Sequence, residues 1–182
     1  MTADAATDVA VVEVVEVPQL MQISLRLDPA GPTAATVAKV LDGELPTTPC
    51  TFRTAGAVDV LWLGPDEWLL VAPAEAAGEL EPLLREAVGA GNAELATLTD
   101  VSAQRTAFDL TGPQVRDVLA QGCAIDLHPR VSPTGTCVQT LLAQTGVILQ
   151  VRDASAPAVR LLVRSSYAPY LAAWLADAAA GL

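Results

Sequence analysis

The feature of this sequence that most constrains its fold is a repeat, in which a strand-like stretch leads through Gly-Pro into a helix-like stretch. The first copy is DPAGP at residues 28–32, and the second is DLTGP at residues 109–113. The two glycines, Gly31 and Gly112, lie 112 − 31 = 81 residues apart. A period this long in a chain of 182 residues indicates duplication of a whole structural unit, because solenoid repeats recur at much shorter intervals.

The elements of each half follow from apolar alternation, helical stripes and turn residues. The first half begins with a strand at 19–27 and a helix from Gly31-Pro32 to Gly43. Strands at 58–63 and 68–72 follow, joined by the four-residue turn 64–67. The last two elements are a helix, with Pro82 in its first turn and Leu80, Leu83, Leu84, Ala87 and Val88 on one side, and a strand at 95–101. The second half begins with a strand at 106–110 and a helix after Gly112-Pro113. Strands at 138–142, 147–151 and 159–163 follow. The last helix has Pro169 in its first turn and is capped by Ser165 or Ser166, and one of its faces carries Tyr167, Tyr170, Leu171, Trp174 and Leu175.

These patterns predict an α+β fold with two pseudo-symmetric lobes that share one core. Each lobe resembles a split βαβ unit, in which helices cover one face of a mixed sheet. We expect the first lobe at residues 18–101 and the second at 102–182. Residues 1–17 are expected to be a flexible tail, and their valines leave two alternatives open, an ordinary N-terminal strand or a segment that pairs with a partner's sheet edge.

The charge of the chain excludes two classes of partner. The formal net charge is −11, and the basic residues form no cluster, so neither nucleic acid nor an anionic membrane is an expected ligand. Only 17% of residues are charged, against ~25% in a typical soluble domain. Either other protein covers part of this surface or the abundant alanines lower the charged fraction. The acidic N-terminus is unlike a secretory signal, so a cytoplasmic location is expected.

The sequence lacks the motifs that carry known chemistry. Three widely spaced cysteines and the single histidine, His128, predict neither a disulfide framework nor a zinc site. Glycine-rich phosphate loops and the Gly-x-Ser-x-Gly motif are missing. Asp66 and Glu67 belong to a turn, where acidic residues are expected for conformational reasons. We therefore predict no catalytic, cofactor-binding or metal-binding residue on this chain.

Aromatic residues are the candidates for a partner interface. Trp62 and Trp68 flank the turn at 64–67, and they fit either a cross-strand pair that fixes the hairpin register or a binding hot spot. Tyr167 and Tyr170 on the last helix complete the candidate interface.

Three segments carry a resemblance to a known family. They are LGPDEWLL at 63–70, DVSAQR at 100–105 leading into LTGP at 110–113, and CVQTLLAQ at 137–144 followed by RSSY at 164–167. Together they resemble the gamma subunits of heterotetrameric sarcosine oxidase over most of the chain from Leu20 onward. The stretch DVS and the following strand-Gly-Pro-helix are similar to a pattern in the wider folate-binding superfamily of the glycine cleavage T protein, whose members are also internally duplicated.

The sequence departs from that superfamily at its catalytic site. The aminomethyltransferases carry a catalytic aspartate in a GGILDD strand, whereas residues 145–151 here are TGVILQV, without a carboxylate. Cys137 remains from a second signature, and the rest of that signature is replaced. Asp153 is the nearest acid, and it is expected to be solvated in the turn at 153–157. The resemblance thus implies the fold of a folate-binding domain without its catalytic site.

The resemblance also implies a function. The chain is expected to be a structural subunit of an oxidoreductase complex, which oxidises sarcosine to glycine with formation of hydrogen peroxide and passes the carbon to tetrahydrofolate. Alpha, beta and delta subunits would be its partners, most directly alpha, and would hold FAD, FMN, NAD, tetrahydrofolate and zinc. The alternatives are a stand-alone folate-binding protein or aminomethyltransferase-like enzyme, and an unrelated adaptor domain.

Overall fold

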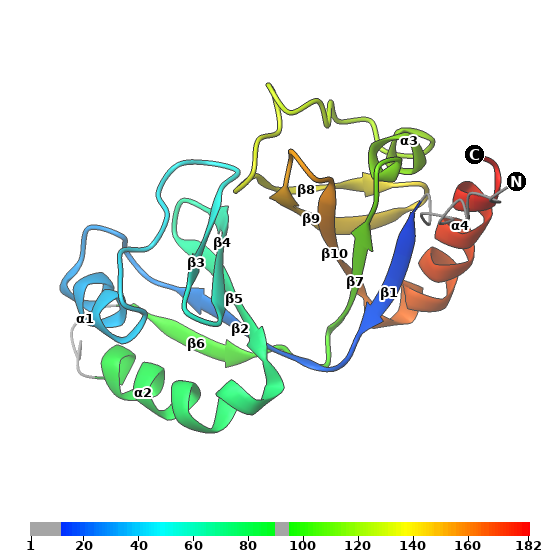
Figure 1. The fold of residues 1–182 in the computed structure, drawn as a ribbon. Coiled ribbons are helices and arrows are strands. Elements are labelled where there is room, and N and C mark those ends of the chain that lie inside the picture. Colours follow the sequence, from blue (N-terminus) through cyan, green and yellow to red (C-terminus); the bar gives the residue numbers. More distant parts are fainter. Residues whose placement is uncertain (1–11, 90–94) are drawn as a thin grey trace, which may run out of the picture.

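The fold consists of two antiparallel sheets that face each other and carry their helices on the outside (Figure 1). The structure is a computed structural model that describes residues 12–89 and 95–182. In these residues each sheet has five strands, in the order β6-β2-β5-β4-β3 for the N-terminal sheet and β1-β7-β10-β9-β8 for the C-terminal sheet. The two orders match strand by strand, which agrees with the duplication predicted from the repeat. Every pair is antiparallel, where a mixed sheet was expected, and hairpins join half of the neighbouring strands.

The observed elements follow the predicted ones closely. The strands are β1 (Glu13–Val17), β2 (Leu20–Arg26), β3 (Phe52–Ala55), β4 (Val58–Gly64), β5 (Glu67–Pro73), β6 (Thr97–Asp100), β7 (Arg105–Thr111), β8 (Cys137–Leu142), β9 (Thr145–Asp153) and β10 (Ala158–Arg164). The helices are α1 (Pro32–Val40), α2 (Ala77–Gly89), α3 (Val115–Ala120) and α4 (Ala168–Ala180), and short 3₁₀ turns precede α2 and α4.

The two sheets exchange their outermost strands. β1 directly precedes β2 in the chain but pairs with β7, and β6 directly precedes β7 but pairs with β2. Glu13–Val17 therefore form a paired strand, although we expected a flexible tail through residue 17; residues 1–11 lie outside the described part of the chain. The strand forms because Val14 packs against the core under the C-terminal sheet while Val17 reaches the opposite face. The division at residues 101/102 falls between β6 and β7, so all strands of the N-terminal sheet come from the first half, whereas the C-terminal sheet also includes β1 from the N-terminal segment.

Side-chain alternation along the strands divides the core into three parts. On β10, Val159, Leu161 and Val163 pack under α3 and α4, while Leu162 points to the other sheet. The N-terminal sheet packs in the same way under α1 and α2. A third, smaller cluster lies between the sheets. Its buried members are Leu20, Leu61, Leu69, Val71, Ala107, Cys137, Ile148 and Leu162. Each fully buried leucine stabilises the fold by about 1.5–3 kcal/mol, so this cluster holds the lobes together.

Three local predictions are wrong for identifiable reasons. Pro82 lies inside α2 rather than in its first turn, because the helix begins at Ala77. Leu83 is exposed, since the apolar stripe of α2 is centred on Leu84. Ser165 does not cap α4; its hydroxyl donates to the Ala103 carbonyl at 2.9 Å and so ties the end of β10 to the segment that precedes β7.

Candidate functional site

The cleft between the sheets is lined by three cross-strand rows of the C-terminal sheet. Alternate residues of β7, β8, β9 and β10 face this cleft, while the intervening ones face α3 and α4. The strand registers place them in rows. The first row is Cys137, Gln150, Arg160 and Asp109, the second is Gln139, Ile148, Leu162 and Ala107, and the third is Leu141, Gly146, Arg164 and Arg105. The second row supplies most of the apolar contacts between the sheets, so it separates two polar ends of the cleft.

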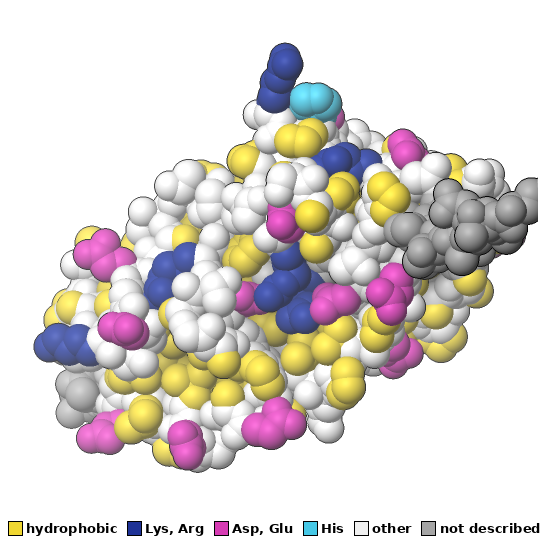
Figure 2. Space-filling view, in the orientation of Figure 1, with side chains coloured by type: hydrophobic (Ala, Val, Ile, Leu, Met, Phe, Trp, Pro, Cys, Tyr) yellow, Lys and Arg dark blue, Asp and Glu magenta, His cyan; other side chains and the backbone are white. Residues whose placement is uncertain are grey.

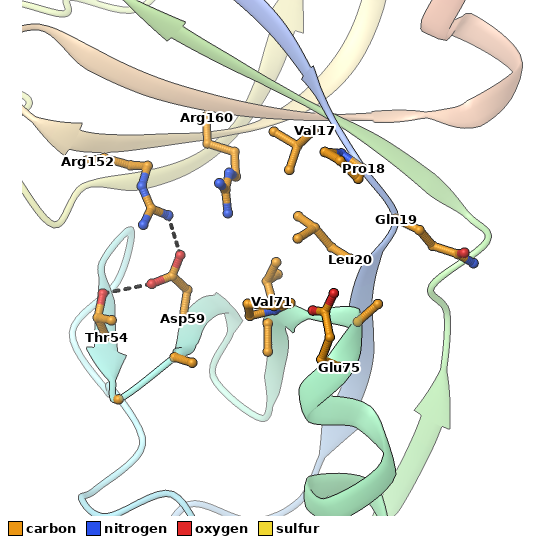
Figure 3. A pocket seen from close by; sticks show the side chains of 15 residues that line it. Val17, Pro18, Gln19, Leu20, Thr54, Asp59, Val71, Glu75, Arg152 and Arg160 are labelled. Atoms are coloured by element: carbon orange, nitrogen blue, oxygen red, sulfur yellow. Dashed lines mark hydrogen bonds and ion pairs between the residues drawn. The ribbon is translucent and has the colours of Figure 1, made fainter.

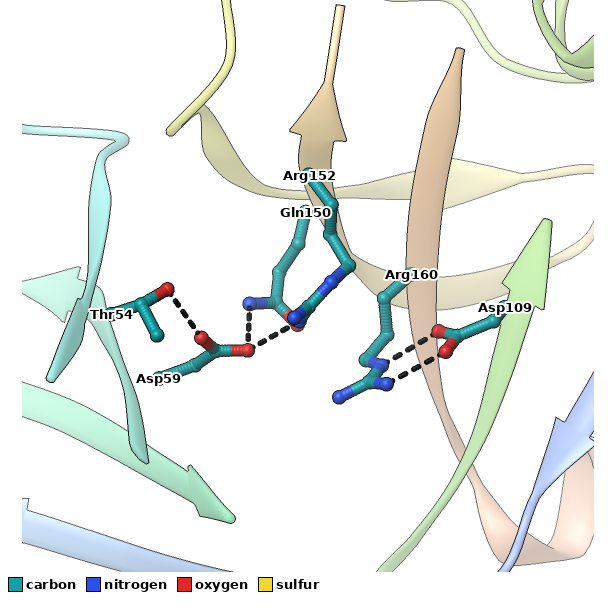
Figure 4. A network of polar contacts seen from close by, with 6 residues as sticks. All are labelled: Thr54, Asp59, Asp109, Gln150, Arg152 and Arg160. Carbon is teal, nitrogen blue, oxygen red and sulfur yellow. Dashed lines mark hydrogen bonds and ion pairs between the residues drawn. The ribbon is translucent and has the colours of Figure 1, made fainter. Parts of the chain in front are cut away.

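One polar end is organised around Asp59, which β4 of the N-terminal sheet presents to the cleft. Its side chain is only 5% exposed. The carboxylate accepts hydrogen bonds from the Thr54 hydroxyl at 2.7 Å and the Gln150 amide at 3.4 Å, and it forms an ion pair with Arg152 (Figure 4). Gln150 and Arg152 belong to β9 of the other sheet. Asp59 therefore connects the two lobes by charge-assisted hydrogen bonds.

A second ion pair lies beside the first. Arg160 on β10 donates to both carboxylate oxygens of Asp109 on β7, each at 2.7 Å, and the two residues are directly opposite in the strand register. These hydrogen bonds, more than the opposing effect of burial, raise the pKa of the Arg160 guanidinium above its ordinary value. A two-pronged contact of this kind fixes the orientation of both groups.

Asp59, Arg152 and Arg160 border a pocket of about 390 Å³. Its other walls come from the β1–β2 connection, the β3–β4 hairpin and the end of β5, including Val17, Leu20 and Val71 (Figure 3). Figure 2 shows basic and acidic side chains together in the middle of this face, with hydrophobic atoms around them. The Asp59 carboxylate in this pocket is already paired with Arg152, and Asp109 beside the pocket is paired with Arg160, so neither is available as a free base.

Asp59 is the polar residue that sequence reasoning missed. The strand at 145–151 carries no carboxylate, and its Gln150 is uncharged and fully buried. The fold supplies a carboxylate to this position from the other lobe. The sequence signal was an aspartate inside the apolar run VDVLWL at 58–63, where a charge needs a partner from elsewhere in the chain.

The remaining candidate residues fall in different parts of the structure. Trp62 and Trp68 are opposite each other on β4 and β5, as expected of a cross-strand pair. Trp68 has no exposed surface and donates its indole N–H to the Pro46 carbonyl at 2.8 Å, so it cannot contact another chain directly. Trp62 is half-buried, while Tyr167 and Tyr170 are exposed near the start of α4 and stay candidates for an interface.

Asp153 and Cys137 have environments that argue against catalysis. The Asp153 carboxylate accepts hydrogen bonds from Ser155 and Ala156 in the β9–β10 turn, which lower its pKa below the ordinary value, and it is solvated as expected. Burial raises the pKa of the Cys137 thiol to about 12, with smaller contributions from Cys50 and Asp59. A thiol that stays protonated is a poor nucleophile.

Two further properties of residues 12–89 and 95–182 bear on function, namely metal binding and the crossing of a membrane. In these ranges no group of three or more His, Cys, Asp or Glu side chains has the geometry to hold a metal ion. Over the same ranges, no helix combines the length and the apolar character that crossing a membrane requires.

Comparisons with known proteins show which family the sequence matches. Residues 26–181 match the sequence model of the sarcosine oxidase, gamma subunit family. The chain is 34% identical to the sarcosine oxidase subunit gamma of Corynebacterium sp. (strain P-1), over 92% of this chain and 79% of that protein. It is 36% identical to the subunit of the same name from Corynebacterium sp. (strain U-96), over 90% and 77%.

Two solved structures are similar to the fold. A chain of the heterotetrameric sarcosine oxidase from Corynebacterium sp. U-96 superposes with a TM-score of 0.83 at 34% identity, covering 93% of this chain and 84% of that one. The glycine cleavage system aminomethyltransferase T from Bartonella henselae superposes with a TM-score of 0.67 at 15% identity, covering 91% of this chain and 45% of the enzyme. The second likeness is one of fold alone, and it confirms the expected similarity of this chain to the fold of an aminomethyltransferase.

Proposed function

Because the chain belongs to the sarcosine oxidase gamma subunit family, we propose that it serves as a non-catalytic subunit of a heterotetrameric sarcosine oxidase. The observation that carries this proposal is that the buried carboxylate in the cleft is already paired within the chain. At the position where the related fold of an aminomethyltransferase is expected to present a catalytic acid, this chain has Gln150, and the carboxylate nearby is paired with Arg152. The charged groups at this position, Asp59 and Arg152, thus join the two lobes.

The proposal assigns the chemistry to the other subunits. The complex oxidises sarcosine to glycine, with FAD, FMN, NAD, tetrahydrofolate and zinc held by the alpha, beta and delta chains. The gamma chain packs most directly on the alpha subunit and stabilises the assembly, in the cytoplasm. Two exposed aromatic residues, Tyr167 in the 3₁₀ turn before α4 and Tyr170 on α4, support a role in contacts between chains, since such residues are enriched at interfaces.

The test compares the isolated chain with the assembled complex. We expect the purified chain to show neither flavin absorbance nor sarcosine oxidation, and to bind tetrahydrofolate no better than weakly in a calorimetric titration. Co-expression with the other three subunits is expected to give a complex that contains this chain and oxidises sarcosine. Micromolar tetrahydrofolate binding with aminomethyl transfer by the isolated chain, abolished by Asp153→Asn, would instead establish a stand-alone enzyme.

A further inference from the structure

The second polar end of the cleft carries two arginines that face each other. Arg105 on β7 and Arg164 on β10 are direct cross-strand partners. They occupy the same relation as Asp109 and Arg160, which lie farther along the same two strands and form the fork-shaped ion pair. Like charges in directly opposite positions destabilise a sheet. The fold alone therefore gives no reason for this pair.

No carboxylate within the described residues forms a hydrogen bond or an ion pair with either guanidinium. Glu67 is the acid whose charge raises the pKa of Arg105, and its carboxylate is held by Arg26 at 2.5 Å. Burial and, to a smaller extent, the charge of Arg164 lower the Arg105 pKa below its ordinary value. The one carboxylate that acts on Arg105 is thus already paired with another arginine, on a chain whose formal net charge is −11.

The two arginines line a hollow that is open to a partner. It has a volume of about 190 Å³, and Gln139, Ile148 and Leu162 form other parts of its wall. Gly146 contributes no side chain, and a Cβ atom built there would meet nothing within 4 Å, so the hollow stays open beside Arg164. Leu141 is opposite Gly146 in the register and is 63% exposed at the edge strand β8. The third row thus combines two guanidiniums, open space above Gly146 and the exposed side chain of Leu141.

We propose that the hollow at Arg105 and Arg164 binds a carboxylate side chain of another subunit, with Leu141 packing against the apolar surface around that carboxylate. The proposal rests on the proposed function, because it requires a partner chain. Charge complementarity is the argument for this occupant: a carboxylate between the guanidiniums would relieve their repulsion and accept N–H groups from both. A planar carboxylate also fits the fork geometry of arginine.

The experiment measures binding of this chain to the complex formed by the other subunits. Arg164→Gln removes one guanidinium, and Arg130→Gln removes an equal charge from an exposed loop of the same lobe as the matched control. We expect Arg164→Gln to raise Kd about tenfold or more and to reduce its dependence on salt, whereas Arg130→Gln leaves Kd within about twofold. Equal Kd values for the wild type and Arg164→Gln would overturn the proposal.

A second variant separates binding from stability. Arg164→Glu places a carboxylate opposite Arg105, so the isolated chain should unfold at a higher temperature while its Kd for the other subunits rises further. A stable Arg164→Glu chain with wild-type Kd would refute the carboxylate site. If the wild-type chain failed to associate at all, the proposed function itself would be contradicted. Tight binding of free sulfate or phosphate to the isolated wild type, lost in Arg164→Gln, would also overturn the assignment to a partner chain.

Discussion

The two ends of the cleft carry similar residues in opposite electrostatic arrangements. At one end the two cleft-facing aspartates are paired with arginines of the same chain, Asp59 with Arg152 and Asp109 with Arg160. At the other end Arg105 faces Arg164, and the nearby Glu67 is engaged by Arg26. The apolar row through Ile148 and Leu162 separates the two ends. The difference indicates that the Asp59–Arg152 ion pair of the first end joins the lobes, whereas the two arginines of the second end await a carboxylate that residues 12–89 and 95–182 do not supply.

The largest expected effect concerns the first end. Asp59→Ala would leave Arg152 and the Gln150 amide without their acceptor in a site that is mostly closed to water. We expect a loss of about 3 kcal/mol in the free energy of unfolding, measured by urea denaturation. Asp66→Ala in the exposed hairpin turn is the control and is expected to cost less than about 0.5 kcal/mol. A loss as small as that of the control for Asp59→Ala would show that the lobes do not depend on this ion pair.

A smaller loss is expected from the neighbouring pair. Asp109→Asn replaces one acceptor oxygen by an NH2 group, so one hydrogen bond from Arg160 is lost and the other loses its charge on the acceptor side. The Asp109 side chain is about a third exposed, so water replaces part of the interaction. We expect about 1–2 kcal/mol by the same denaturation measurement. If the cost exceeded that of Asp59→Ala, the second pair rather than the first would be the main polar contact of this end.

The buried thiol in the first row predicts a pH dependence. The Cys137 pKa of about 12 in the folded chain exceeds the ordinary value of 9.0. Above pH 9.0 the unfolded chain therefore loses this proton while the folded chain keeps it, and the free energy of unfolding falls as pH rises toward 12. Cys137→Val should remove this part of the decline. Iodoacetamide should label the exposed Cys50 much faster than Cys137, and equal rates would contradict a closed cleft.

The smallest effect tests the second end and has the opposite sign. Arg105→Asp would recreate, opposite Arg164, the arrangement that Asp109 and Arg160 have in the first row. We expect the isolated chain to gain about 0.5–1 kcal/mol in the free energy of unfolding. A loss of stability would mean that the stem of Arg105 contributes more by packing than its charge costs by repulsion.

The sequence predicts the fold through strictly local signals. The Gly-Pro pairs, the turn at 64–67 and the alternation along each strand are sufficient to locate nearly all elements and to recognise the duplication. What they do not contain is the pairing of distant strands. The exchange of β1 and β6 depends on pairing between residues that lie about 70 to 100 positions apart, and a local pattern carries no information about it.

The same limit applies to the cleft. Asp59 stands out as a charge inside an apolar run, but neither its own strand nor that of Gln150 and Arg152 identifies the partner. The three residues form a site only because β4 and β9 face each other across the two sheets. Likewise, Arg105 and Arg164 become a pair only through the register of β7 and β10. Trp68 illustrates the converse, since a residue type that is common at interfaces is here used entirely for the core.

Sarcosine oxidation by the complex assembled with a double variant of this chain tests the central claim most directly. Asp59→Leu with Arg152→Met replaces the lobe-joining ion pair by apolar groups of similar size, a change that proteins often tolerate without loss of stability. Once the variant is shown to assemble, we predict wild-type kcat and KM, because the cleft of this subunit takes no part in the chemistry. A large fall in kcat in a fully assembled complex would contradict that prediction and place catalytic groups in this cleft.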